Sequence, residues 1–292
     1  MRLEYRILWI EDEETWLRVP RKKIEKEIFD YGFVPYVDAV SDCDISKLDL
    51  LSYDMIFVDY NLDKCSPKQY GNKILEELRS KNIYADAIFY SSSNTEDLYS
   101  KVKEADLVNV SVMHRDVFKP ENIKQVVEII KYFLKKQLDL NTMRGIMMAE
   151  VANFDNYIWD ILENLNTQKE IINYTRSKQI EKNKKFEDLT DEDLWKNLKD
   201  KNISTIYLTS GSRGTYLKNT MKDVAEKNIE YKDFYECLKR YYEEVSETRN
   251  QLAHRENVSA EDESFFIEIR KNIIKHKKNL INLKEKVLKG KL

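Results

Sequence analysis

Short apolar runs alternate with helical stretches through the first half of this sequence, and this alternation constrains the fold more than any other feature. Five runs have the length and apolar content of buried strands: 5–10, 33–40, 55–59, 87–90 and 108–113. Segments with apolar residues at helical spacing follow four of them: 17–31, 71–81, 94–105 and 120–138. The pattern predicts an α/β fold with a five-stranded, parallel, doubly wound sheet in flavodoxin-like order. Pro35 weakens the second strand prediction, because proline cannot donate a hydrogen bond within a sheet.

After about residue 138 the chain shows helical periodicity only. Three segments keep apolar residues at helical spacing: 146–165, 231–254 and 263–288. The segment 203–219 is rich in Ser, Thr and Gly, which predicts a loop. We therefore expect two domains, the sheet domain at 1–138 and an all-α helical bundle at 139–292. No Pro- or Gly-rich linker separates them, so the sequence predicts a stiff connection.

Charge is distributed unevenly along the chain. Residues 1–138 contain 21 Lys and Arg against 25 Asp and Glu, whereas residues 270–292 contain nine Lys and Arg against one Glu. An acidic first half and a basic tail indicate different partners, and a basic helix at 270–292 would attract RNA phosphates. Arg213 and Lys218 are expected to add phosphate contacts. His276, within a Lys-rich helix, is expected to be solvated.

The sequence also limits where the protein acts. No apolar run approaches the roughly 20 residues needed to cross a membrane, and the acidic start is unlike a signal peptide. Three cysteines, Cys43, Cys65 and Cys237, lie far apart without a CxxC pair. Such spacing excludes a zinc framework and is typical of a reducing compartment. We expect a cytoplasmic protein that does not bind membranes.

Acidic residues follow the predicted strands at the points where those strands end. Glu11 and Asp12 follow the first strand, Asp59 ends the third, and Ser91 ends the fourth. The carboxyl ends of parallel strands meet at one edge of the sheet, where ligands bind. Three converging carboxylates would repel each other unless a hard cation lay among them, and oxygen ligands suit Mg²⁺. An Asp in such a cluster can act as a nucleophile toward a phosphoryl group.

Four motifs give residues 4–137 a resemblance to the receiver domain of two-component response regulators. They are ILWIEDE, DMIFVDYNL, YGNKILEELR and AIFYSSS. The resemblance implies that Asp59 is the phosphoacceptor and that Ser91 is the switch residue. It implies Mg²⁺ bound by Glu11, Asp12, Asp59 and the backbone carbonyl of Asn61. It also implies a cognate histidine kinase or another phosphodonor as a partner.

One position departs from the receiver pattern. The family has a Lys at the end of its fifth strand, whereas VNVSVM is followed here by His114, Arg115 and Asp116. Spacing favours Arg115 or His114 for this place, and the literal Lys-Pro pair, Lys119 with Pro120, comes later in the chain. A guanidinium can pair with phosphoryl oxygens, but its geometry differs from that of an ammonium. The alternative is a receiver fold that is never phosphorylated and serves as a docking platform.

The sequence RNQLAH in the second half combines residues suited to metal-free chemistry on phosphate. Arg249 can grip a phosphate, and His254 can move a proton near neutral pH. The sequence resembles the Arg-polar-x-x-x-His signature of HEPN domains, all-helical modules that include many ribonucleases. The resemblance implies Arg249 and His254 as the catalytic pair, Asn250 as a polar helper, and an active site formed across a homodimer.

Together the two resemblances imply a receiver-gated, metal-independent endoribonuclease that acts in stress or phage defence. Its partners would be RNA, a phosphodonor and a second copy of the chain. The alternative is a signalling adaptor whose helical domain binds a partner protein without catalysis. A transcriptional regulator is the third possibility, and the sequence shows no helix-turn-helix pattern that would favour it.

Overall fold

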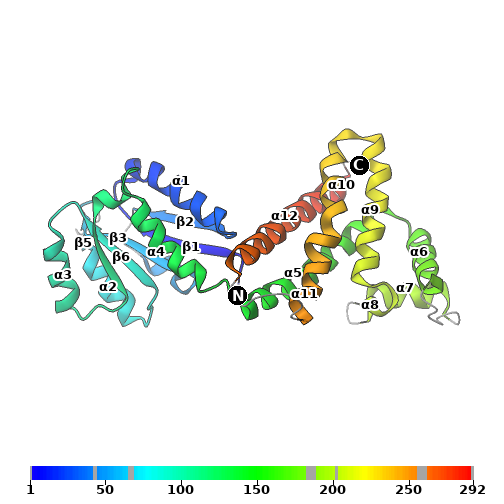
Figure 1. Ribbon diagram of the computed structural model, residues 1–292, viewed down its shortest axis with the longest axis horizontal. Helices are drawn as coiled ribbons and strands as arrows, with labels where there is room; N and C mark the ends of the chain where they lie inside the picture. Colours follow the sequence, from blue (N-terminus) through cyan, green and yellow to red (C-terminus); the bar gives the residue numbers. More distant parts are fainter. Residues whose placement is uncertain are drawn as a thin grey trace. The chain divides into compact units, whose positions relative to one another are not determined.

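The chain forms two compact units, Arg2–Gln137 and Leu138–Leu292, in the computed structural model (Figure 1). We call them the sheet unit and the helical unit. The structure describes residues 2–41, 45–64, 69–181, 189–200, 203–254 and 262–290. Cys43 and Cys65 lie outside the described residues. Within them, no helix combines the length and apolarity needed to span a bilayer.

A five-stranded parallel sheet forms the centre of the sheet unit and confirms the predicted fold class. Its strands are β1 (Glu4–Ile10), β2 (Val34–Val40), β3 (Met55–Asp59), β6 (Asp86–Ser91) and β7 (Val110–His114). Their spatial order is β2-β1-β3-β6-β7, and each neighbouring pair is parallel. The first strand therefore lies inside the sheet, which brings the carboxyl ends of β1 and β3 side by side. Pro35 is accommodated because β2 is an edge strand.

Helices cover both faces of this sheet (Figure 1). They are α1 (Glu14–Asp30), α2 (Gly71–Ser80), α3 (Thr95–Glu104) and α4 (Lys124–Lys135). Alternate strand residues face α2 and α3 in one core: Leu8, Ile10, Ile56, Val58 and Phe89 pack with Ile74, Leu75, Leu78 and Leu98. On the opposite face, α1 packs against α4, and Trp9 contacts Phe57 and Phe118 at 5.0 Å between ring centroids.

Short elements connect the larger ones. The 3-10 turns are η1 (Ile45–Lys47), η2 (Leu50–Ser52) and η3 (Arg115–Phe118), and β4 (Asn61–Leu62) pairs antiparallel with β5 (Gln69–Tyr70). Helix α1 begins earlier than the sequence predicts, so Pro20 lies inside the helix and not in its first turn.

Helices alone make up the described part of the helical unit. The unit comprises α5 (Leu140–Leu165), α6 (Gln168–Glu181), α7 (Asp191–Lys199), α8 (Ser204–Tyr207), α9 (Ser210–Lys227), η4 (Ile229–Tyr231), α10 (Lys232–Tyr241), η5 (Tyr242–Glu247), α11 (Thr248–His254) and α12 (Glu263–Leu288). Helix α5 is central, because α9, α11 and α12 all pack against it. Its apolar face buries Met147, Phe154, Ile158 and Leu162.

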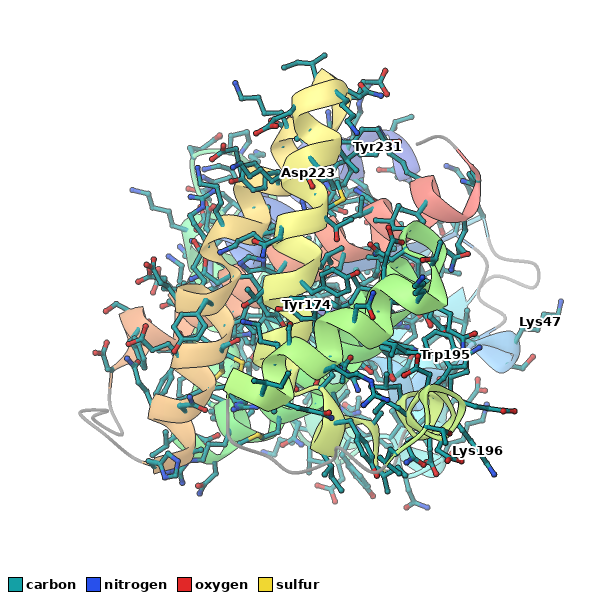
Figure 2. The ribbon with its side chains drawn as sticks, turned by 90° about the vertical axis from the view of Figure 1, so that its right-hand side faces the viewer. Lys47, Tyr174, Trp195, Lys196, Asp223 and Tyr231 are labelled. Atoms are coloured by element: carbon teal, nitrogen blue, oxygen red, sulfur yellow. The ribbon has the colours of Figure 1, made fainter. Side chains whose placement is uncertain are left out.

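The loop predicted for 203–219 is wrong, because α8 and the first half of α9 occupy this segment. The Thr209 side chain caps α9 by accepting a hydrogen bond from the backbone N–H of Ser212. Packing then outweighs the weak helix propensity of Ser and Gly. Leu217 is fully buried, and Tyr216 stacks on Tyr174 of α6 with centroids 4.1 Å apart, beside α9 in Figure 2.

The solvated position expected for His276 is also wrong, because its side chain is fully buried. Its Nε2 lies 2.7 Å from a Glu244 carboxylate oxygen, and its Nδ1 lies 3.4 Å from the Cys237 thiol. A carboxylate can only accept, so the neutral imidazole donates from Nε2 and accepts at Nδ1. Burial lowers the pKa of His276 to about 4. The helix face that carries it is therefore part of the core.

We predict that His276 makes the helical unit acid-sensitive. Its folded pKa lies below its ordinary value of 6.5, so the unfolded chain binds the extra proton as the pH falls from 6.5 toward 4. The free energy of unfolding should fall by about 3 kcal/mol over this window, and the lowered pKa of Glu244 acts in the same direction. Urea unfolding at several pH values measures the slope.

The variant His276→Gln should flatten that slope, whereas His114→Gln, at an exposed histidine, is the control. An unchanged slope in His276→Gln would contradict the assignment of the acid sensitivity to this imidazole.

Candidate functional site

Three buried carboxylates meet at the carboxyl edge of the sheet. Ile10 of β1 is paired with Val58 of β3, so the chain places Glu11 next to Asp59 as both strands end. Glu11, Asp12 and Asp59 are 0%, 5% and 3% exposed. One carboxylate oxygen from each lies within 4.8 Å of the others. The structure thus brings together the three residues that the sequence places at the strand ends.

In this cluster, burial and the repulsion between carboxylates outweigh the nearby positive charge of Arg115. Burial, and then the charge of Glu11, raise the pKa of Asp59 to about 7. Burial also raises the pKa of Glu11, against the hydrogen bonds that it accepts. Asp59 Oδ1 is buried and has no hydrogen-bond partner. An oxygen-only donor set with an unsatisfied carboxylate oxygen fits Mg²⁺, which would remove the mutual repulsion.

Glu11 is held in place by a chain of buried hydrogen bonds that the sequence did not predict. Trp9 Nε1 donates to the Tyr90 hydroxyl at 2.7 Å, and that hydroxyl donates to Glu11 Oε2 at 2.8 Å. The backbone N–H of Glu13 donates to Glu11 Oε1 at 3.0 Å. Trp9 and Tyr90 read as ordinary core residues in the sequence, because a strand pattern does not show that the Tyr90 hydroxyl accepts from Trp9 and donates to Glu11.

Arg115 reaches the acidic cluster, whereas Lys119 does not. Arg115 Nη2 lies 3.3 Å from Glu11 Oε1 and 2.7 Å from Glu13 Oε2. Its guanidinium lies over the Trp16 ring, 4.4 Å from the ring centroid. Lys119 forms an exposed ion pair with Asp116 at 2.8 Å. Among the basic residues that the sequence offers for this place, Arg115 pairs with Glu11, whereas His114 Nε2 lies 3.2 Å from the Ser92 carbonyl oxygen.

The segment after β3 contributes three further hydrogen bonds. Ser91 is fully buried, and its Oγ accepts from Asn61 Nδ2 at 3.4 Å. The backbone N–H of Lys64 donates to Asp12 Oδ2 at 2.8 Å, and its Nζ donates to the Asp12 carbonyl at 2.7 Å. The sequence had assigned no role to Lys64. Its position in the loop that follows the Asp59 strand is the signal that could have identified it.

Gly71 allows α2 to begin directly against the phosphoacceptor candidate. A Cβ atom at this position would lie 2.1 Å from the Asp59 carbonyl oxygen and 2.7 Å from Val58 Cγ1. Any side chain would therefore displace the end of β3. The Gly that leads this helix is needed for the close backbone approach.

The helical unit presents Arg249, Asn250 and His254 on one short helix, α11. The helix continues from α10 through η5, a π-helical stretch, directly into α11. Arg249 Nη2 and Nε donate to Asn250 Oδ1 at 2.7 and 3.2 Å. His254 is exposed at the end of α11. Among the described residues of a single chain, no hydrogen bond joins Arg249 to His254, so the structure places them on one element without bringing them into contact.

The basic residues predicted to contact phosphate differ in exposure. Arg213 is only 4% exposed, whereas Lys218 is half-buried on α9. On α12, Arg270 is fully buried, and Lys277 and Lys284 form ion pairs with Glu150 and Asp160 on α5 at 2.9 and 2.6 Å. Part of the basic tail is therefore neutralised within the unit.

No protein-family model matches the sequence. No curated protein matches it. Among solved structures, the chain is similar to a CheY-like response regulator receiver domain protein from Methanospirillum hungatei JF-1, with 18% identity over 46% of this chain and 96% of that one, at a TM-score of 0.35. It is also similar to the receiver domain of the Francisella response regulator 1452, with 18% identity over 46% of this chain and 99% of that one, at a TM-score of 0.34. A third is the phosphorylated cyanobacterial phytochrome response regulator RcpA, with 19% identity over 44% of this chain and 89% of that one, at a TM-score of 0.31.

We predict that Tyr90→Phe destabilises the sheet unit by about 1–3 kcal/mol, because Trp9 Nε1 and Glu11 Oε2 would each lose a buried hydrogen-bond partner. Tyr99→Phe, which removes an exposed hydroxyl on α3, is the matched control. Urea unfolding followed by circular dichroism measures both. Equal stability of the two variants would show that the Tyr90 hydroxyl does not hold Glu11.

Proposed function

We propose that the sheet unit is a phosphoacceptor of two-component signalling and that Asp59 takes the phosphoryl group. The cluster of three buried carboxylates around Asp59 carries this proposal. Burying three carboxylates that repel each other costs free energy unless each has an ion-pair partner. Carboxyl groups with shifted pKa values are common at functional sites. Asp59 Oδ1, which has no hydrogen-bond partner, is the oxygen available as the nucleophile.

Glu11, Asp12 and Asp59 would hold Mg²⁺, which would neutralise charge on the phosphoryl oxygens. The chain supplies further positive charge from two sides. Arg115 lies on the Glu11 side of the cluster, and Lys64 lies on the Asp12 side. These cations can pair with phosphoryl oxygens once Asp59 is modified. Ser91, already hydrogen-bonded to Asn61 in the loop after β3, is placed to report that change.

A phosphodonor follows from this chemistry. An Asp nucleophile takes its phosphoryl group from a donor with high transfer potential, such as a phosphohistidine of a histidine kinase or acetyl phosphate. We place the protein in a cytoplasmic signalling route on this basis. The helical unit would then be the part that the phosphorylated sheet unit controls.

We predict that the wild-type chain gains one phosphoryl group from acetyl phosphate with Mg²⁺ and that Asp59→Asn gains none, because the amide is not a nucleophile. Asp97→Asn, at an exposed acid on α3, is the control and should be modified like the wild type. Intact-mass spectrometry measures the gain. An unmodified wild-type chain, or modification that survives Asp59→Asn, would overturn the proposal.

A second function, metal-independent RNA cleavage by the helical unit, is favoured by the surroundings of Arg249. Its guanidinium is oriented by two hydrogen bonds to Asn250, and α11 directly follows a π-helical stretch, a feature frequent at functional sites. An Arg can grip the phosphate, and the exposed His254 can move the proton. Because Arg249 and His254 do not contact each other within one chain, a second copy of the chain in a homodimer would supply the other side of the active site. The rival is an adaptor whose helical unit binds a partner protein.

We predict that Arg249→Ala and His254→Ala each lower RNA cleavage by about a hundredfold or more, since each removes one role in the same step. Arg240→Ala, at an exposed arginine on α10, is the control and should cleave like the wild type. Cleavage of a labelled RNA in EDTA measures the rates. Cleavage that EDTA abolishes, or that survives both substitutions, would overturn the assignment to Arg249 and His254, and a chain that cleaves no RNA would leave the adaptor as the function.

A further inference from the structure

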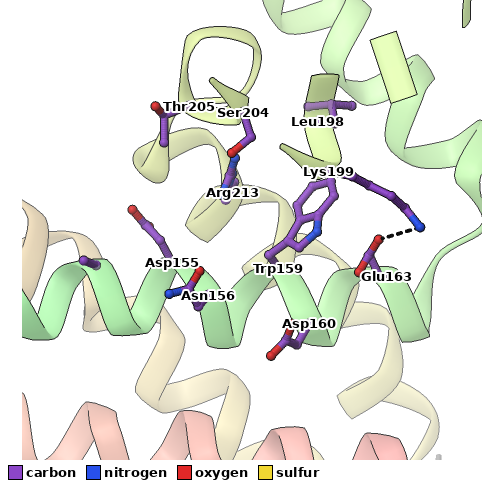
Figure 3. Close-up of a pocket in the computed structure, with 11 residues that line it drawn as sticks. Asp155, Asn156, Trp159, Asp160, Glu163, Leu198, Lys199, Ser204, Thr205 and Arg213 are labelled. Atoms are coloured by element: carbon purple, nitrogen blue, oxygen red, sulfur yellow. Dashed lines mark ion pairs between the residues drawn. The ribbon is translucent and has the colours of Figure 1, made fainter. Parts of the chain in front are cut away.

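A polar cavity lies wholly within the helical unit, between α5, α7, α8 and α9 (Figure 3). Its volume is about 410 Å³, which is the size of a small-molecule site. The walls combine the indole of Trp159 and the side chain of Leu198 with charged groups. No role that we have proposed for Asp59 or Arg249 uses this cavity.

Most of the charge that lines the cavity is already paired. Lys199 forms an ion pair with Glu163 at 3.4 Å, the dashed line in Figure 3. Asp160 is paired with Lys284 of α12 at 2.6 Å. Among the charged residues that line the cavity, these pairs leave Asp155 of α5 and Arg213 of α9. The cavity therefore carries little net charge and has one acidic and one basic group to offer.

Arg213 and Asp155 each hold an unused hydrogen-bonding atom. Arg213 is 4% exposed, its Nε donates to the Leu208 carbonyl at 3.0 Å, and its guanidinium lies over the Trp159 ring at 5.1 Å. Its Nη2 has no hydrogen-bond partner. Asp155 Oδ2 accepts from the Ser210 hydroxyl, whereas Oδ1 is buried without a partner. Leaving a buried donor and a buried acceptor unsatisfied costs free energy that an occupant could recover.

We propose that this cavity binds a nucleobase, with Arg213 donating a hydrogen bond to it and Asp155 accepting one from it. Every common base carries a donor beside an acceptor on a planar edge, which complements this pair. Arg213 already lies over the Trp159 ring, so a base would extend this stack from the guanidinium plane and would not enter between the two groups. An isolated phosphate fits poorly, because the charge of Arg213 is offset by the carboxylate of Asp155, which lines the same cavity.

The base can belong to a free nucleoside or to an RNA strand. The proposal is independent of phosphorylation at Asp59 and of cleavage at Arg249. If the base belongs to RNA, the cavity gives the helical unit a base preference. If the base belongs to a nucleoside, the unit senses a small molecule.

Calorimetric titration of the full chain with the four common nucleosides, a short oligoribonucleotide and inorganic phosphate tests the proposal. At least one nucleoside or the oligoribonucleotide should bind. Arg213→Met and Asp155→Asn should each weaken that binding about tenfold or more, since each removes a hydrogen bond to a charged group. Asp223→Asn, at an exposed acid on α9 that does not line the cavity, is the matched control. Circular dichroism verifies that each variant is folded.

Binding of the oligoribonucleotide alone, with the same sensitivity to the two variants, assigns the base to RNA, and binding of a nucleoside assigns it to a small molecule. N6,N6-dimethyladenosine has no exocyclic N–H to donate. If adenosine binds, this analogue should not. The proposal is overturned if neither nucleosides nor the oligoribonucleotide bind, if phosphate binds as well as they do, or if Arg213→Met and Asp155→Asn leave binding unchanged. None of these outcomes depends on RNA cleavage, so the two proposals can fail separately.

Discussion

The repulsion among Glu11, Asp12 and Asp59 is the constraint on which the sheet unit depends. The parallel pairing of β1 with β3 forces their carboxyl ends together, and the acids that follow those strands cannot move apart without breaking the sheet. The surrounding residues limit the cost. Tyr90 donates to Glu11, Arg115 lies beside it, and Lys64 donates to Asp12. Even so, the pKa of Asp59 is raised to about 7, because the negative charge of the cluster is not fully compensated. A bound cation would compensate it.

The helical unit buries two sets of polar groups, and their hydrogen bonds are satisfied to different extents. The core pair of His276 with Glu244 is complete, because each nitrogen of the imidazole has a partner. The cavity between α5 and α9 is not complete, because Arg213 and Asp155 each retain an unpaired atom. A satisfied network stabilises a fold, whereas an unsatisfied one beside a cavity indicates a place for a ligand.

Much of the sheet unit could be predicted from the sequence because its signals are local. Short buried strands and the acids at their ends are visible in a single pass, as with Asp59, the last residue of MIFVD. What could not be predicted depends on contacts between distant segments. The Tyr90 hydrogen bond to Glu11 joins residues 79 positions apart, and the burial of His276 depends on Glu244, 32 positions away. The sequence predicts a loop at 203–219 because Ser and Gly are weak helix formers. The Thr209 cap and tertiary packing nevertheless stabilise a helix there.

The melting temperature of the sheet unit as a function of Mg²⁺ concentration tests the central claim most directly. An ion that binds only the folded cluster must raise this temperature steadily with its concentration. The wild-type chain should melt below Asp59→Asn without Mg²⁺, because the variant removes one repelling charge, and should become more stable as Mg²⁺ is added, while the variant responds weakly. A wild-type melting temperature that is unchanged by Mg²⁺ would contradict the account.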